Sequence, residues 1–157
     1  MTSITRILLP IDFSPTSRLA LEWTMGLART HRASVTLLHV QDLPDLTPLS
    51  PSMEALLPSY NFLNEVVSAR HEEAKALLGE WIKPYEGDGV PIDSKFCQGV
   101  PFDVILDVCQ QGGHDLIVMG THGRTGVGRF LLGSTTERVV RLSPVPVLTV
   151  RLPTTDA

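Results

Sequence analysis

The sequence is poor in cysteine and in aromatic residues, and it lacks a long hydrophobic run. Only Cys97 and Cys109 are cysteines among its 157 residues, and aromatic residues make up 6%. Neither cysteine stands in a CxxC or Cys/His spacing, so the pattern gives no metal site and favours two buried free thiols. No apolar stretch approaches the roughly 20 residues that a membrane-spanning helix needs. The N-terminus has no signal-peptide pattern, and we therefore expect a cytoplasmic protein without a membrane span.

Positive charge is also scarce. The chain has 13 Lys and Arg residues against 17 Asp and Glu residues, which gives a formal net charge of −4. Nucleic-acid binding draws its affinity from a basic face, so this composition argues against a nucleic-acid partner. Arg124 and Arg129 are a local exception, and two interpretations stay open. They bind a phosphate group, which arginine does well, or they solvate a surface loop.

Several signatures of enzymes and nucleotide sites are missing. The G-x-G-x-x-G pattern would need glycine where Leu131 stands, and the Walker pattern would need Lys and Ser or Thr where Arg129 and Phe130 stand. The chain has no G-x-S-x-G elbow, and no pair of carboxylates stands out as catalytic. We therefore assign no catalytic residue and no metal ligand.

The chain does contain apolar runs that alternate with helical patterns, which is typical of an α/β fold with a mainly parallel sheet. Its length fits one domain over residues 1–157. Strands are predicted over residues 5–11, 34–40, 90–97, 116–119 and 144–150. Helices are predicted after Ser14-Pro15, over residues 61–83, from Pro101 and from about Ser134. The alternation in residues 90–97 and the prolines of residues 144–150 favour edge positions for these two strands.

Each of the first three helices carries a stripe of apolar residues that we expect to be buried. These stripes are Leu19, Ala20, Trp23 and Leu27; then Val66, Val67, Ala74, Leu77, Leu78 and Trp81; then Val104, Ile105 and Val108. Ser14 is predicted to cap the first helix, Pro84 to stop the second, and Gly112-Gly113 to cap the third. Residues 41–60 form a long, proline-rich connection that is a flap, a partner surface or, as we favour, ordinary packing over the sheet edge.

The most informative segment follows the fourth strand, where Gly120, Gly123 and Gly133 precede the hydroxyls of Ser134 and Thr135. Glycine lets backbone N–H groups approach a phosphate closely, and a following helix offers its positive N-terminus. A long turn that needs glycine is the alternative, but the spacing favours a phosphate site. Ser134 and Glu137 also fit a capping box, and a cap and an anion site can coexist there.

Ligands of open α/β sheets bind outside the carboxyl ends of the strands, where the strand order reverses. If the first strand is central, residues 10–12 and residues 120–135 face each other across that crevice. Asp12 then accepts from a ribose hydroxyl, helps to place a metal, or only caps the turn at Ser14. Val40 ends the second strand and borders the same crevice, as a wall for a base or as a core residue.

With these residues in place, the chain closely resembles the universal stress protein family. The nucleotide-binding subgroup carries G-2x-G-9x-G-[S/T], which Gly120, Gly123, Gly133 and Ser134 match without a gap. Residues 118–126 and 131–139 are similar to the most typical segments of that family, residues 7–12 to its first strand and residues 144–150 to its last. The likeness covers nearly the full length, and only residues 41–60 lack family character.

The resemblance implies an open five-stranded parallel sheet in the order 3-2-1-4-5 with helices on both faces, and ATP, with Mg or another divalent ion, in the crevice. It also implies a homodimer through the last strand, from Val145 to Val150, with further pairing left open. The function implied is an ATP-binding stress-response regulator that acts on an unknown protein partner through its nucleotide state. A slow or partner-stimulated ATPase or phosphotransferase is the alternative, with His122, Arg124 and Arg129 as candidate groups. A third interpretation is an adaptor whose crevice is vestigial or holds another adenine nucleotide. The candidate cofactor-binding residues are Pro10, Asp12, Val40, Met119, Gly120, Gly123, Arg124, Gly133, Ser134 and Thr135.

Overall fold

The computed structural model describes residues 3–42, 60–121 and 132–153. Most of the proline-rich connection, together with His122, Gly123, Arg124 and Arg129, lies outside these ranges. The elements are β1 (Arg6–Ile11), α1 (Pro15–His31), β2 (Ser34–Gln41), α3 (Tyr60–Ile82), the 3-10 turn η1 (Lys83–Tyr85), β3 (Ile92–Gln98), α4 (Pro101–Gln111), β4 (Leu116–Gly120), α5 (Ser134–Leu142) and β5 (Val147–Val150).

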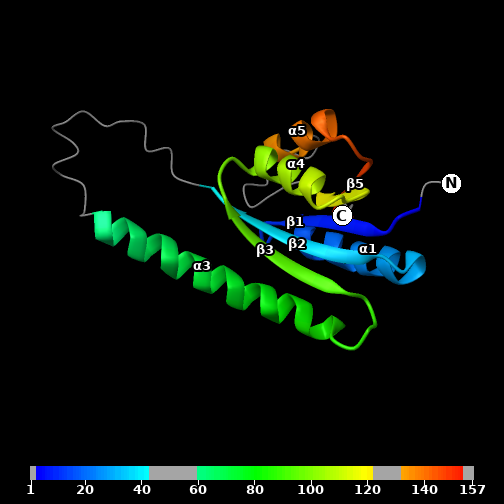
Figure 1. The fold of residues 1–157 in the computed structure, drawn as a ribbon, viewed down its shortest axis with the longest axis horizontal. Coiled ribbons are helices and arrows are strands. Elements are labelled where there is room, and N and C mark those ends of the chain that lie inside the picture. The colour runs from blue at the N-terminus through cyan, green and yellow to red at the C-terminus, as the bar shows by residue number, and fades with distance from the viewer. Residues whose placement is uncertain (1–2, 43–59, 122–131, 154–157) are drawn as a thin grey trace.

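The five strands form one parallel sheet in the order β3-β2-β1-β4-β5, as predicted (Figure 1). The central strand β1 pairs with β2 through Ile7 and Val35 and with β4 through Ile7 and Leu116. The edge positions of β3 and β5 are also confirmed. β5 begins only at Val147, because Pro144 and Pro146 cannot donate to a ladder, although the Pro146 carbonyl still accepts from Ile117 N at 3.0 Å.

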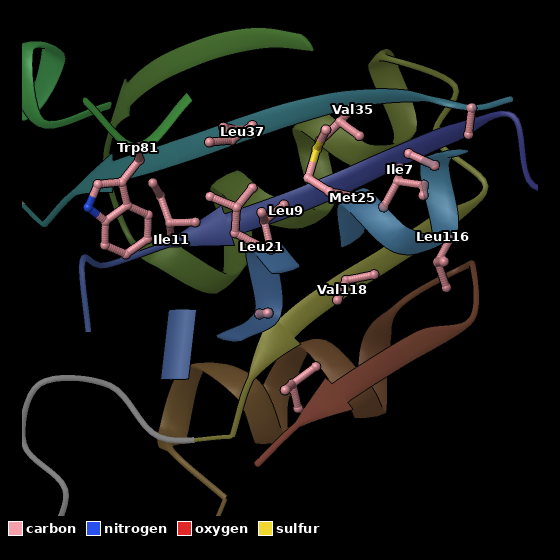
Figure 2. Packing of buried hydrophobic residues seen from close by; sticks show 14 of the residues in the cluster. Ile7, Leu9, Ile11, Leu21, Met25, Val35, Leu37, Trp81, Leu116 and Val118 are labelled. Atoms are coloured by element: carbon pink, nitrogen blue, oxygen red, sulfur yellow. The ribbon is translucent and has the colours of Figure 1, made fainter. Parts of the chain in front are cut away.

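The sheet separates two apolar layers, with α1 and α3 on one side and α4 and α5 on the other (Figure 1). Alternate residues of β1 enter opposite layers, since Ile7 and Leu9 pack under α1 while Leu8 packs under α4. Figure 2 shows the first layer, in which Met25 and Leu21 of α1 and Trp81 of α3 meet the strands. Each such side chain contributes about 1.5–3 kcal/mol when fully buried, so both layers hold the strand ends in place.

The prediction for the buried face of α1 was wrong at Trp23, which is 57% exposed. The residues that face the sheet are smaller on average, and they include Ala20, Thr24 and Ala28. Small side chains let α1 lie close to the strands, and Thr24 can be buried because its hydroxyl donates to the Ala20 carbonyl at 2.8 Å. The prediction, which favoured large hydrophobic residues, therefore placed the buried stripe too far to one side of the helix.

The remaining helices follow the prediction with small differences. In α3, Ala74, Leu78 and Trp81 are buried and Leu77 is half-buried. The α-helix ends at Ile82, and Pro84 lies within the 3-10 turn that follows. In α4, Ile105 and Val108 are buried and Val104 is half-buried. None of the helices in the described ranges is both long and apolar enough to cross a membrane.

Candidate functional site

A cavity of about 220 Å³ opens at the carboxyl ends of β1, β2 and β4, where the strand order reverses. All of the candidate residues that the structure describes line this cavity, and Gly123 and Arg124 lie outside the described ranges. Sequence reasoning missed other lining residues, among them Ser17 and Thr136. The lining residues are Pro10, Ile11, Asp12, Ser17, Leu38, Val40, Pro101, Ile105, Met119, Gly120, Gly133, Ser134, Thr135 and Thr136.

One end of the cavity is built by the turn from β1 into α1. Ser14 is the N-cap of α1, as predicted, and its hydroxyl accepts from Ser17 N at 3.2 Å. The Asp12 carboxylate accepts from Ser14 N at 3.0 Å and from the Ser17 hydroxyl. Asp12 therefore does cap this turn, which was one of its three predicted roles, and it faces the cavity as well.

The residue between Asp12 and Ser14 has an unusual backbone. Phe13 has φ of 63°, a left-handed conformation that a bulky side chain seldom adopts. Its ring lies 4.8 Å from the His39 ring and 5.3 Å from the Trp81 ring, measured between centroids. This aromatic packing holds the strained turn, which brings the Asp12 side chain back to the N-terminus of α1.

Gly120 ends β4 at the wall of the cavity, and packing explains why it is glycine. A Cβ at this position would lie 2.9 Å from Thr16 Cβ and 3.1 Å from the Thr16 carbonyl carbon. No real Cβ makes so close a contact, so any side chain would push α1 away from β4. Gly120 thus serves the close approach of α1, besides the backbone access for a ligand that the sequence suggested.

The other end of the cavity is the N-terminus of α5. Its N-cap is Gly133, whose N–H donates to the Thr121 carbonyl at 2.8 Å. The predicted capping box was wrong, because Ser134 is the first helical residue and no side chain in the described part caps the helix. The N–H groups of Ser134, Thr135 and Thr136 consequently lack acceptors within the helix, and these residues line the cavity.

Thr136 ties the first turn of α5 to Gly120. Thr136 is 4% exposed, and its hydroxyl donates to the Gly120 carbonyl at 2.9 Å. The bond fixes the first turn of α5 against the end of β4. The turn therefore presents its N–H groups to the cavity from a fixed position.

A further side of the cavity, formed by β2, β4 and α4, is apolar. Leu38 and Met119 are buried at the ends of β2 and β4, and Ile105 of α4 covers them. Val40 and Pro101 complete this wall and are half-buried. Such a surface suits an apolar group of a ligand.

Asp12 is the one ionisable side chain among the described residues of the cavity, and no cluster of His, Cys, Asp or Glu there could hold a metal ion. Cys109 is buried, as predicted, and burial, with help from the Asp115 carboxylate, raises the pKa of its thiol. The prediction was wrong in part for Cys97, which is only half-buried on the edge strand β3.

The arrangement as a whole suits a ligand with three chemically different parts. The α5 end offers N–H donors and the positive end of a helix to an anion. The α1 end offers a carboxylate that accepts from hydroxyl or amine donors. The side of the cavity formed by Val40 of β2 and Ile105 of α4 offers apolar surface. These three features together match the phosphate, sugar and base of a nucleotide.

Comparison with known proteins places the chain in a family. The model of the universal stress protein family matches residues 3–151. Universal stress protein MJ0577 of Methanocaldococcus jannaschii is 34% identical over 152 residues, which cover 93% of this chain and 94% of that protein.

Solved structures agree with this result. The structure of MJ0577 has a TM-score of 0.82 and 31% identity, and the match covers 98% of this chain and 100% of that one. Universal stress protein UspA from Lactobacillus plantarum has a TM-score of 0.79 and 27% identity, with 96% and 100% covered. A family protein from Arabidopsis thaliana with AMP bound shares the fold at a TM-score of 0.65, with 19% identity and 96% and 93% covered. The chain belongs to the universal stress protein family.

Proposed function

We propose that this protein binds ATP in the cavity between β1 and β4 and acts as a stress-response regulator through its nucleotide state. The observation that carries the proposal is the N-terminus of α5, which no described side chain caps and which lines a cavity opposite an apolar wall. Three backbone N–H groups and the helix dipole at one point favour a phosphate group over a neutral ligand.

The lining residues support one orientation of the nucleotide. The phosphates meet the N–H groups of Ser134 and Thr135, the sugar lies near Asp12, and the base rests on Val40 and Ile105. A carboxylate repels phosphate, so the charge of Asp12 favours this direction over the reverse one. The AMP bound by the family protein from Arabidopsis thaliana supports an adenine nucleotide as the ligand class.

The described residues accommodate a divalent ion only together with the phosphates. Mg²⁺ is commonly held by one or two protein oxygens, by phosphate oxygens and by water. The hydroxyls of Ser134 and Thr135 stand at the end of the cavity where the phosphates would lie. A bound ion would neutralise phosphate charge there, next to the positive end of α5.

We further propose that the protein is a homodimer through the last strand and its flank, from Val145 to Val150. β5 is an edge strand with few polar side chains, and Leu148 on it is 36% exposed. A second copy that pairs with this edge would satisfy its backbone groups and cover its apolar side chains. Sedimentation velocity checks this, and a monomer at all protein concentrations would contradict it.

The test of the nucleotide proposal starts with protein purified without added nucleotide. One sample is denatured and the released small molecules are identified by chromatography. A second sample, freed of nucleotide, is titrated with ATP, ADP and AMP by calorimetry. We expect a stoichiometric adenine nucleotide or saturable ATP binding, and slower hydrogen exchange at residues 132–136 with ATP. Failure of all three nucleotides to bind would contradict the proposal. Binding without any change in exchange would contradict the regulatory part alone.

A further inference from the structure

Ser17 is a cavity residue that no sequence motif singled out. It stands in the first turn of α1, is 4% exposed, and forms two hydrogen bonds with Asp12. Its hydroxyl donates to Oδ1 of Asp12 and accepts from the backbone N–H of the same residue at 3.2 Å. The Ser17 hydroxyl is thus both a donor to and an acceptor from Asp12, and these two hydrogen bonds fix the χ angles of both side chains.

The rest of the turn leaves the Asp12 carboxylate little freedom. Ser14 N donates to the same oxygen, Oδ1, at 3.0 Å, and Phe13 holds the backbone between them in its left-handed conformation. Two donors on one oxygen set the plane of the carboxylate. Of these two donors, the Ser17 hydroxyl belongs to a side chain, so a substitution such as Ser17→Ala removes it and leaves the backbone donor in place.

A carboxylate held in this way can select one part of a nucleotide. It only accepts hydrogen bonds, so it favours a group that donates and repels phosphate. The donors on the sugar are its 2′ and 3′ hydroxyls. We infer that Ser17 is a positioning residue, which holds the Asp12 carboxylate where it accepts from the sugar hydroxyls and so makes the site prefer ribose over deoxyribose. This inference rests on the proposed function.

The experiment compares nucleotides that differ in their sugar hydroxyls, in the unaltered protein and in its variants. Calorimetric titrations of the full-length protein use ATP, 2′-deoxy-ATP, 3′-deoxy-ATP and 2′,3′-dideoxy-ATP. We expect the unaltered chain to prefer ATP over the dideoxy analogue by about tenfold, the value of one hydrogen bond to a charged group. Ser17→Ala should lower that preference by about fivefold and leave the affinity for the dideoxy analogue unchanged, because only the sugar hydroxyls contact the carboxylate.

Two further variants separate positioning from general damage. Thr24→Ala removes another buried hydroxyl from α1, one that donates to the Ala20 carbonyl away from the cavity, and it should keep the full ribose preference. Ser17→Cys keeps the shape of the side chain, with a somewhat larger sulfur in place of the oxygen, but donates only weakly, so it should lose preference as Ser17→Ala does. In an Asp12→Asn background, Ser17→Ala should have no further effect on the preference, since the charged acceptor is already gone.

The outcomes are distinguishable. An unchanged preference in Ser17→Ala and Ser17→Cys, or an equal loss of affinity for all four nucleotides, would overturn the positioning role and leave the proposed function standing. A chain that binds ATP and the dideoxy analogue equally well would overturn the sugar contact of Asp12 and this inference with it. A chain that binds none of the four would overturn the proposed function itself.

Discussion

The two ends of the cavity differ in the groups that they present. At the α1 end this group is a side chain, the Asp12 carboxylate, which is held by the Ser17 hydroxyl and one backbone N–H. At the α5 end, the groups that line the cavity belong largely to the backbone, and no described side chain caps the helix. A side-chain network can be altered one residue at a time, whereas backbone donors are lost only to proline or to movement of the chain.

The two ends are nevertheless mechanically linked through the end of β4. Gly120 contacts Thr16 of α1 on one side, and its carbonyl accepts from Thr136 of α5 on the other. A change at Gly120 should therefore disturb both ends, while a change at either end should stay local. Three substitutions test this difference.

The largest effect is expected for Gly120→Val, because the new Cβ would overlap Thr16, whose backbone belongs to the packed helix α1. Overpacking of this kind costs about 1–3 kcal/mol and occasionally more. Because Gly120 is linked to both α1 and α5, stability and binding should suffer together: the urea midpoint of unfolding should fall and ATP binding should weaken. The matched control is Gly26→Ala, since Gly26 lies in α1 with no atom within 4 Å of an added Cβ. The free energy of unfolding of Gly26→Ala should rise by about 0.5–1 kcal/mol. Equal stability of Gly120→Val and the unaltered chain would contradict the tight contact.

The next effect isolates the backbone end. Ser134→Pro deletes one N–H that faces the cavity, and the first helical position tolerates proline. Gly133 before it has φ of −58° and ψ of 148°, which is compatible with a following proline. Loss of one hydrogen bond to a charged group is worth about 1.5–3 kcal/mol, so ATP affinity should fall tenfold or more.

Ser134→Ala is the control for that substitution, since it removes the hydroxyl and keeps the N–H. We expect it to lower ATP affinity much less than Ser134→Pro does, with thermal unfolding of both variants close to that of the unaltered chain. If calorimetry gave the two variants the same affinity, the hydroxyl rather than the backbone would hold the phosphates.

These features differ in how far the sequence could foretell them. The consecutive apolar residues of β1, the Ser14-Pro15 start of α1 and the glycine spacing are local patterns, and they placed the strands and most of the described cavity residues. Ser17 and Thr136 were not predicted, because a buried hydroxyl in a helix has no periodic signal in the sequence. Their roles depend on Asp12 and Gly120, which only the fold brings close to them.

The errors at Trp23 and Ser134 have related causes. Helical periodicity locates an apolar stripe, but the distance between helix and sheet decides whether large or small residues face inward, and α1 lies close enough to favour Ala20 and Ala28. At Ser134 the S-x-x-E pattern fits a capping box, but the helix begins one residue earlier. The Thr121 carbonyl accepts from Gly133 N at 2.8 Å, and the Gly133 carbonyl accepts from Glu137 N at 2.9 Å, which makes Gly133 the N-cap. Both outcomes depend on tertiary contacts that no local window contains.

The smallest effect is expected near the amino ends of the strands, opposite the cavity, where a titration should alter stability and leave both ends of the cavity unchanged. His114 is buried before β4, with Nδ1 3.3 Å from the Cys109 carbonyl and Nε2 3.0 Å from the Thr36 hydroxyl. A carbonyl only accepts, so Nδ1 carries the proton and Nε2 accepts from Thr36. Burial lowers the pKa of His114, and the positive charges of Lys95 and Arg6 lower it further, against the opposing effect of the Cys109 and Val108 carbonyls.

The unfolded chain therefore binds this proton more readily than the folded one. The contribution of His114 to the free energy of unfolding should be complete above about pH 6.5 and should decline as the pH falls from there to the folded-state pKa, by about 1.4 kcal/mol for each unit of difference. Urea unfolding between pH 5 and pH 7.5 measures this, and His114→Gln, which cannot titrate, should flatten the slope. The ATP affinity of His114→Gln at pH 7.5 should equal that of the unaltered chain, because the cavity lies at the carboxyl ends of the strands. A lower affinity would mean that β4 transmits a change from its amino end to the cavity. Effects of substitutions near β4 would then not stay local.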